Sequence, residues 1–365
     1  MREQNANATD QPYSQRLRRR PTRRSVLQAL GATAVIGTTV PGLASGISSE
    51  NIIYLRGSYD SPVPFERIRE ARQKAAQRGN SQKVKGSANP AFPENGRIVD
   101  YIVTPRGNGI PRQFIGVAGN PQSVDDVHAR AQEKAQAFKN GGQDQGGSSS
   151  DGSDGLVSIS QTGSGWNNVT PTDDEGYYSE YPYGAVQNNF DWWKLTNSQE
   201  EYGRDTHAIH QYHAMIPGKS KWGGSESEWQ NEYAKAYHWW NRGEQTNPEL
   251  RKWDPYTQDG SSYNISIGTS TEPLSWSFPV NNTDLHTNTD FTVPRAEWKW
   301  QIWGNQYRES TMGFEPGSTC EVDEHSCGQY DLLEFRSYGG FQNELDLSRH
   351  GLYYDWTLWW DFGTC

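Results

Sequence analysis

The chain has 365 residues, with 34 basic and 44 acidic side chains and a formal net charge of −10. This acidic balance argues against nucleic acid and anionic membranes as partners, because both attract positively charged surfaces. Only 33% of the residues are hydrophobic, yet 15 Trp, 19 Tyr and 11 Phe can build a core, since each buried ring removes roughly 150–250 Å² from water.

The N-terminal segment has the pattern of an export signal. Arg23 and Arg24 precede a weakly apolar run (26–43) that is rich in Gly, Ala and Thr and is followed by small residues. A basic start, an apolar centre and a small-residue exit are the parts of a signal peptide. The paired arginines resemble those of twin-arginine (Tat) signals. This resemblance implies that residues 1–45 direct export of a folded chain by the Tat translocase.

An acidic chain behind a Tat-type signal is also similar to the exported proteins of halophilic archaea. That resemblance implies a secreted protein, either extracellular or associated with the cell surface. No second long apolar run follows residue 44, so we expect no transmembrane anchor in the mature chain.

Residues 50–138 are expected to form a small α+β domain. Apolar and β-branched runs predict strands, while periodic apolar residues with capping signals predict helices. The expected order is β-α-β-β-α, with strands over 51–59, 97–105 and 112–119 and helices over 62–79 and 123–138.

Residues 139–155 are rich in Gly, Ser and Asp and contain almost no apolar residues. Such a composition predicts a flexible, solvated linker. A small domain between a signal and a linker is similar in layout to propeptides that assist the folding of secreted proteins.

Residues 156–365 are expected to form a Trp-rich, mostly antiparallel, sandwich-like β domain. Apolar and polar residues alternate with a period of two in several runs, which is typical of strands with one buried face. One segment, 225–240, instead has aromatic residues at helical spacing and predicts a helix. The alternating runs are 207–216, 263–268, 274–280, 297–303, 332–339 and 352–362.

His207, His210 and His213 form the densest cluster of potential metal ligands. If the segment is a strand, His207 and His213 point to one side and His210 to the other. Two imidazoles with a carboxylate could bind zinc and leave a position for water, as in metal-dependent hydrolases. The alternative is that these histidines are polar-face residues of an outer strand. No HExxH spacing accompanies them.

The Trp-Trp pairs are the second candidate for a site. Neighbouring residues of a strand point to opposite faces, so one ring of each pair is expected to face solvent. Exposed rings can stack on sugars, and this predicts glycan binding at Trp192, Trp239 and Trp359. The alternative is that all these rings belong to the core.

The three cysteines favour a disulfide in an exported protein. The short loop between Cys320 and Cys327 predicts a bond between these two, while a bond from either of them to Cys365 remains an alternative. Acidic clusters at 173–175, at 321–324 and from Asp144 to Asp154 in the linker could bind calcium, but none has EF-hand spacing, and a solvated acidic surface explains them better. We expect no obligatory cofactor.

The sequence therefore favours a secreted, non-enzymatic protein that binds a glycan or a cell-envelope component through exposed aromatic rings. The first alternative is a metal-dependent extracellular hydrolase that uses the histidine cluster. The second is a secreted toxin or bacteriocin-like antagonist with an N-terminal pro-domain.

Overall fold

The computed structural model describes residues 52–79, 86–105, 111–139, 160–161, 165–196, 203–240, 246–256, 261–290 and 292–362. The predicted signal peptide and residues 140–155 of the predicted linker lie outside these ranges. In the described part of the chain, no helix is both long and apolar enough to span a membrane.

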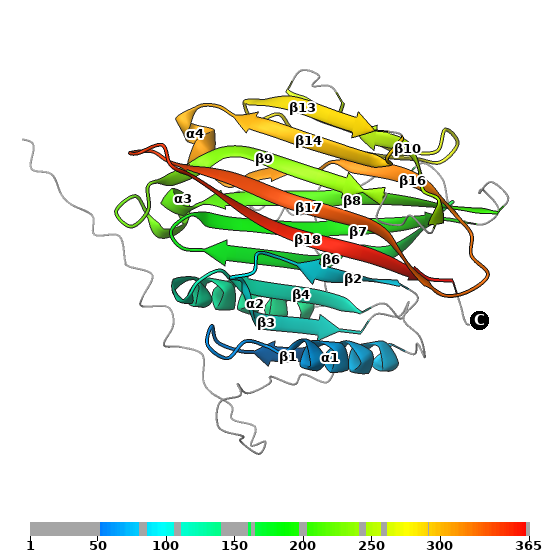
Figure 1. The fold of residues 1–365 in the computed structure, drawn as a ribbon, viewed down its shortest axis with the longest axis horizontal. Helices are drawn as coiled ribbons and strands as arrows, with labels where there is room; N and C mark the ends of the chain where they lie inside the picture. The colour runs from blue at the N-terminus through cyan, green and yellow to red at the C-terminus, as the bar shows by residue number, and fades with distance from the viewer. Residues whose placement is uncertain are drawn as a thin grey trace, which may run out of the picture. The chain divides into compact units, whose positions relative to one another are not determined.

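A nine-stranded sheet contains strands from both halves of the chain (Figure 1). Its order is β1-β3-β4-β6-β7-β8-β16-β10, with β15 also paired to β8, and every described pairing is antiparallel except that of β4 with β6. The strands are β1 (Ile53–Arg56), β3 (Arg97–Thr104), β4 (Arg112–Ala118), β6 (Trp166–Glu180), β7 (Gly184–Leu195), β8 (Arg204–Pro217), β10 (Glu249–Asp254), β15 (Met312–Phe314) and β16 (Gly317–Asp323).

A six-stranded antiparallel sheet has the order β13-β14-β9-β17-β18-β2, and a three-stranded sheet has the order β11-β12-β5. Figure 1 shows β13, β14, β9, β17 and β18 side by side. The strands are β2 (Gly86–Ala91), β5 (Ser160–Gln161), β9 (Trp229–Trp239), β11 (Ser262–Gly268), β12 (Pro273–Pro279), β13 (Thr283–Asp290), β14 (Arg295–Ile302), β17 (Gln329–Asn343) and β18 (Arg349–Asp361).

Four short or medium α-helices and one 3-10 turn complete the described secondary structure. Helix α1 buries Ile68, Ala71 and Ala75, and α2 buries Val127 and Ala131, in both cases at the helical spacing seen in the sequence. The helices are α1 (Phe65–Arg78), α2 (Val124–Lys139), α3 (Gly218–Trp222) and α4 (Asn305–Arg308), and the 3-10 turn η2 is Pro121–Ser123.

The prediction of a β-rich, mostly antiparallel fold is confirmed, and each of the six alternating runs named above forms a strand, apart from the last residue of 274–280, 297–303 and 352–362. The region before the predicted linker contains β1, α1, β2, β3, β4, η2 and α2 in that order. Strand β4 pairs with β6, and β2 pairs with β18. The two regions that the sequence separates thus share two sheets.

The helix predicted over 225–240 is wrong, because most of this segment forms strand β9. Tyr233 and Tyr237 lie on one face of β9, whereas Ala234, Ala236 and His238 are buried on the other. Trp229, Tyr233 and Trp240 stand at positions i, i+4 and i+11 of the sequence, so they also fall at helical spacing. Pairing with β14 and β17 on either side decides the outcome.

The main core lies where the inner face of the six-stranded sheet packs against the nine-stranded sheet. The Phe190 ring on β7 makes edge contacts with Phe335 on β17 and Trp356 on β18, at centroid distances of 5.0 and 5.5 Å. Trp298 and Trp300 on β14 are almost fully buried on the same inner face. Large rings supply the buried area that aliphatic residues supply in more ordinary domains.

Candidate functional site

The outer face of the six-stranded sheet carries a set of partly exposed rings. Side chains alternate along a strand, so β9 directs Tyr233, Tyr237 and Trp239 outward while it buries its alanines. Tyr338 on β17 and Tyr353 on β18 have the same orientation. We call these five residues the aromatic face.

Strand register arranges the outer face in rows that cross the sheet. One row contains His286, Lys299, Lys235, Tyr338 and Tyr353, each opposite the next on the neighbouring strand. Directly opposite side chains interact, since their Cβ atoms are only about 4.5–5.5 Å apart. The row therefore places basic groups at one end and phenol rings at the other.

Two glycines allow the tyrosine rings to lie close to the sheet. A Cβ atom at Gly340 would be 2.5 Å from the Tyr233 ring, and one at Gly351 would be 1.9 Å from the Tyr338 hydroxyl oxygen. The two rings are nearly parallel, with centroids 5.8 Å apart and planes 11° apart. Glycine at these positions thus fixes the orientation of the rings on the surface.

Arg336 connects the two ends of the aromatic face. Its guanidinium carbon is 5.0 Å from the Trp239 ring centroid and 4.6 Å from that of Tyr353. Its Nε–H and one terminal N–H group donate to the two Asp355 carboxylate oxygens, each at 2.6 Å, and these bonds raise the pKa of Arg336 against the effect of burial. A bidentate pair of this kind holds the cation and both rings in one geometry.

A hollow of about 200 Å³ opens on this face beside Tyr237. It lies over β9, β13 and β14, and both charged and uncharged polar groups line it. The lining residues are Lys235, Tyr237, His286, Thr287, Asn288, Glu297, Trp298 and Lys299.

The three tryptophans predicted to bind a ligand have different environments. Trp192 is fully buried, so the prediction of an exposed ring is wrong there: its indole N–H donates to His207 Nδ1 at 3.1 Å within the core. Trp239 and Trp359 are partly exposed on the outer face. Trp360, the neighbour of Trp359, points inward and contacts Trp192 at 5.4 Å between centroids.

The histidine cluster lies on β8, and all three imidazoles are fully buried. They do not share a set of neighbours: His207 packs on Trp192 and Trp360, and His213 packs on Phe314. Burial lowers the pKa of His207, next to the Lys194 charge, to about 3, and burial alone lowers that of His213 to about 3. Both side chains are therefore neutral at ordinary pH.

His210 faces the other side of β8 and lies between two carboxylates. Its Nε2 atom is 2.9 Å from Glu315, and its Nδ1 atom is 3.4 Å from Asp191. Burial alone would lower the pKa of His210, but the hydrogen bonds and charges of Asp191 and Glu315 raise it to about 9. The result is a buried imidazolium between two acidic groups.

A fourth buried histidine, His238 on β9, joins the two large sheets. The Ser318 hydroxyl accepts the indole N–H of Trp240 and lies 2.7 Å from the Nδ1 atom of His238, to which it can donate its own proton. The group next to Nε2 is a carbonyl oxygen, which can only accept, and this assigns the imidazole proton to Nε2. The Nε2–H group then donates to the Gln211 carbonyl oxygen at 2.9 Å. The Trp240, Ser318, His238 and Gln211 side chains thus form a series of hydrogen bonds in the core, as buried polar groups require.

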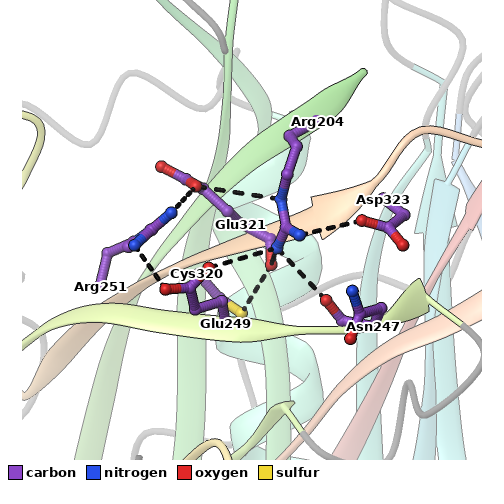
Figure 2. A network of polar contacts seen from close by, with 7 residues as sticks. All are labelled: Arg204, Asn247, Glu249, Arg251, Cys320, Glu321 and Asp323. Atoms are coloured by element: carbon purple, nitrogen blue, oxygen red, sulfur yellow. Dashed lines mark hydrogen bonds and ion pairs between the residues drawn. The ribbon is translucent and has the colours of Figure 1, made fainter. Parts of the chain in front are cut away.

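Among the described residues, no group of three or more His, Cys, Asp or Glu side chains is arranged to hold a metal ion. The zinc and calcium sites stay predictions. In the acidic cluster at 321–324, Figure 2 shows Glu321 and Asp323 directed toward two arginines. Arg204 lies 2.9 Å from Asp323, and Arg251 lies 2.5 Å from Glu321. Cations of the protein itself thus neutralise these carboxylates.

The predicted bond between Cys320 and Cys327 is wrong, because Cys320 is a free thiol. Cys320 lies within β16 opposite His207 and is fully buried, whereas Cys327 lies in the following loop. The alternation of β16 directs the Cys320 sulfur into the core and away from that loop. The alternative bond from Cys327 to Cys365 involves a residue outside the described ranges and stays a prediction.

The Cys320 thiol is expected to be inert in the folded protein. Burial raises its pKa well above the ordinary value, and the thiolate is the reactive form. Labelling with a thiol reagent at pH 7.5, followed by peptide mass analysis, should leave Cys320 unmodified in native protein and modify it in urea. Rapid labelling of native Cys320 would contradict its placement in β16.

Comparisons with known proteins do not assign a family. No family model matches the chain, and no curated protein matches it. Solved structures with weak similarity include a "Pore forming protein" at 9% identity, with a TM-score of 0.30 and coverage of 57% of this chain and 97% of the other. Another is the Clostridium perfringens delta-toxin at 7% identity, with a TM-score of 0.30 and coverage of 57% and 89%. Similarity at this level does not define a function.

Proposed function

We propose that this chain is a secreted binding protein that recognises a glycan or another cell-envelope component through the aromatic face. The observation that carries this proposal is the ordered set of partly exposed rings on a rigid sheet. Tyr and Trp rings supply large contact areas at a low cost in conformational entropy, and with Arg they dominate binding energies at interfaces.

The aromatic face is held in place before any ligand arrives. Glycines beneath Tyr233 and Tyr338 and the Arg336–Asp355 pair fix the rings from below and from the side. A surface that is already ordered loses little freedom on binding, so more of the contact energy appears as affinity. Export by the Tat route, which the N-terminal sequence predicts, would deliver this face to the outside of the cell.

The burial of the three histidines gives less support to the hydrolase alternative. His207 and His213 are packed on aromatic rings, and His210 is enclosed by its two carboxylates. A catalytic zinc needs at least one coordination position that water and substrate can reach. The antagonist alternative requires that the N-terminal region can be removed from the folded protein.

Substitution of the rings tests the proposal. We expect Trp239→Ala and Tyr353→Ala each to weaken retention on isolated cell envelopes at least tenfold, because central aromatic contacts are worth about 2 kcal/mol or more. Retention of the folded full chain is measured on envelopes and on a panel of polysaccharides. Tyr256→Ala is the matched control, since Tyr256 is 62% exposed and lies outside the six-stranded sheet. Equal retention of all variants would refute the assignment.

A further inference from the structure

Three basic side chains lie next to one another on three strands at one end of the aromatic face. Lys235 is directly opposite Lys299, and Lys299 is directly opposite His286. Lys235 and Lys299 carry like charges, and like charges in such cross-strand positions destabilise a sheet. We call these three residues the basic row.

The lysines of the basic row have ring contacts in place of ion pairs. The Lys235 ammonium lies 5.3 Å from the Tyr233 centroid and 5.6 Å from that of Tyr338, and the Lys299 ammonium lies 5.0 Å from Tyr233. Among the described residues, neither lysine forms an ion pair with a carboxylate. The free protein therefore retains a repulsion that a bound anion would relieve.

The same three residues line the 200 Å³ hollow. The carboxylate at its edge, Glu297, is already engaged by the Trp239 indole and the Asn288 amide, each at 3.4 Å. The hollow is smaller than the pockets that enclose drug-sized molecules. It therefore suits one charged group of a larger ligand whose remainder lies on the surface.

The neighbouring positions in the row show where that remainder would lie. Beyond Lys235 the row continues into the rings of Tyr338 and Tyr353. A local concentration of positive charge is also unusual in a chain whose formal net charge is −10. An anionic group and an adjoining flat, partly apolar ring match this combination of charge and aromatic surface.

We propose that the basic row binds the anionic group of an acidic glycan, such as the carboxylate of a uronic acid, while neighbouring sugar rings stack on Tyr338 and Tyr353. This assignment rests on the proposed function and names the class of glycan.

Calorimetry with the full chain tests the assignment against two matched probes. These are a hexamer of galacturonic acid and the same hexamer with every carboxylate methyl-esterified. The acidic hexamer is expected to bind at least tenfold more tightly. The double variant Lys235→Gln/Lys299→Gln should reduce its affinity to that of the ester, whereas Lys74→Gln, which removes one charge from an exposed position on α1, should leave it unchanged. Equal affinities for the two hexamers, or an unaffected double variant, would overturn the inference.

Two further measurements separate the possible failures. If both hexamers bind equally and Trp239→Ala abolishes the binding of both, the ligand site on the aromatic face is supported and the role of the basic row is refuted. If the folded chain binds neither hexamer, the inference falls, and loss of envelope retention as well would remove the proposed function. Tighter binding of a thymidine dodecamer than of the acidic hexamer would overturn the choice of a glycan.

Stability gives a readout that does not depend on the ligand. Lys299→Gln removes the charge that faces both Lys235 and His286. The urea midpoint of this variant should equal or exceed that of the parent, because repulsion is relieved. A lower midpoint with unchanged affinity would show that Lys299 serves only the fold and would refute its assignment to a ligand site.

Discussion

The free energy of unfolding is expected to be largest near pH 6.5 and to fall on both sides. On the acid side, burial holds the pKa of His207, His213 and His238 at about 3, with small contributions from neighbouring charges at His207 and His238. In the unfolded chain each titrates near 6.5. The unfolded state thus binds more protons below pH 6.5, and each histidine costs about 1.4 kcal/mol of stability per pH unit.

Three such histidines together give a slope of about 4 kcal/mol per pH unit once the pH is well below 6.5. Because whole domains are stable by only about 5–15 kcal/mol, the protein should unfold between about pH 4 and 5. Urea titrations followed by Trp fluorescence at several pH values measure this directly. His213→Phe should reduce the acid slope by about a third, and a slope that is unchanged in this variant would contradict the buried, neutral state of His213.

On the alkaline side, the pKa shift of His210 has the opposite sign, so this residue lowers the stability as the pH rises. Its folded-state pKa of about 9 lies above the unfolded value, so its stabilising effect is complete below pH 6.5 and is lost as the pH rises through 9. The loss should reach about 3 kcal/mol. His210→Gln should remove this slope and destabilise the protein by about 3–5 kcal/mol at pH 6.5, because Asp191 and Glu315 would then lack their buried cation. Constant stability of the parent from pH 6.5 to 9.5 would argue against the imidazolium.

The second large effect concerns the N-terminal region. Cleavage within 140–155 is expected to leave both parts of the chain associated, and a chain that begins after residue 139 should fail to fold as a soluble monomer. Strand β4 pairs with β6, and β2 pairs with β18. Removal of these strands would expose the edge of β6, which invites aggregation.

A buried ion pair adds to this attachment. Glu175 on β6 accepts two hydrogen bonds from Arg130 on α2, at 2.8 and 3.1 Å, and lies 3.2 Å from the Lys134 ammonium. Burial would raise the pKa of Glu175, but these two cations hold it below its usual value. Glu175→Ala should cost about 3–5 kcal/mol, because it leaves the cations without their partner.

Gel filtration after cleavage at an inserted protease site in 140–155 measures the association. A single peak that contains both parts is expected, and the fragment should remain bound until urea unfolds the whole molecule. Release of a folded 156–365 fragment would contradict the shared sheets and would favour the antagonist with a removable pro-domain.

The sequence predicted single strands well where their pattern was local. The alternation in 297–303 placed Trp298 and Trp300 opposite Lys299, and the structure has this arrangement in β14. The helix predicted over 225–240 is wrong because Trp229, Tyr233 and Trp240 also fall at helical spacing, although the segment forms strand β9. Period alone cannot separate a helix from a strand that is covered on one face by alanine and histidine and carries rings on the other.

The candidate site required information that no local pattern contains. Alternation indicates which side chains share a face, but only strand register shows that Lys235 lies opposite both Lys299 and Tyr338. These residues are far apart in the sequence. The environment of His210 also depends on residues that are distant in the sequence, since Glu315 lies in the segment between β15 and β16. The available local signal was Tyr233, Lys235 and Tyr237 at every second position of β9, with alanines between them.

Hydroxyl-radical footprinting of the full chain, with and without a retained envelope glycan, tests the central claim most directly because it reports individual side chains. We expect the ligand to leave the exposed Tyr256 unchanged and to protect the aromatic face, namely Tyr233, Tyr237, Trp239, Tyr338 and Tyr353. Protection at Tyr256 with none on the aromatic face would contradict the proposed site.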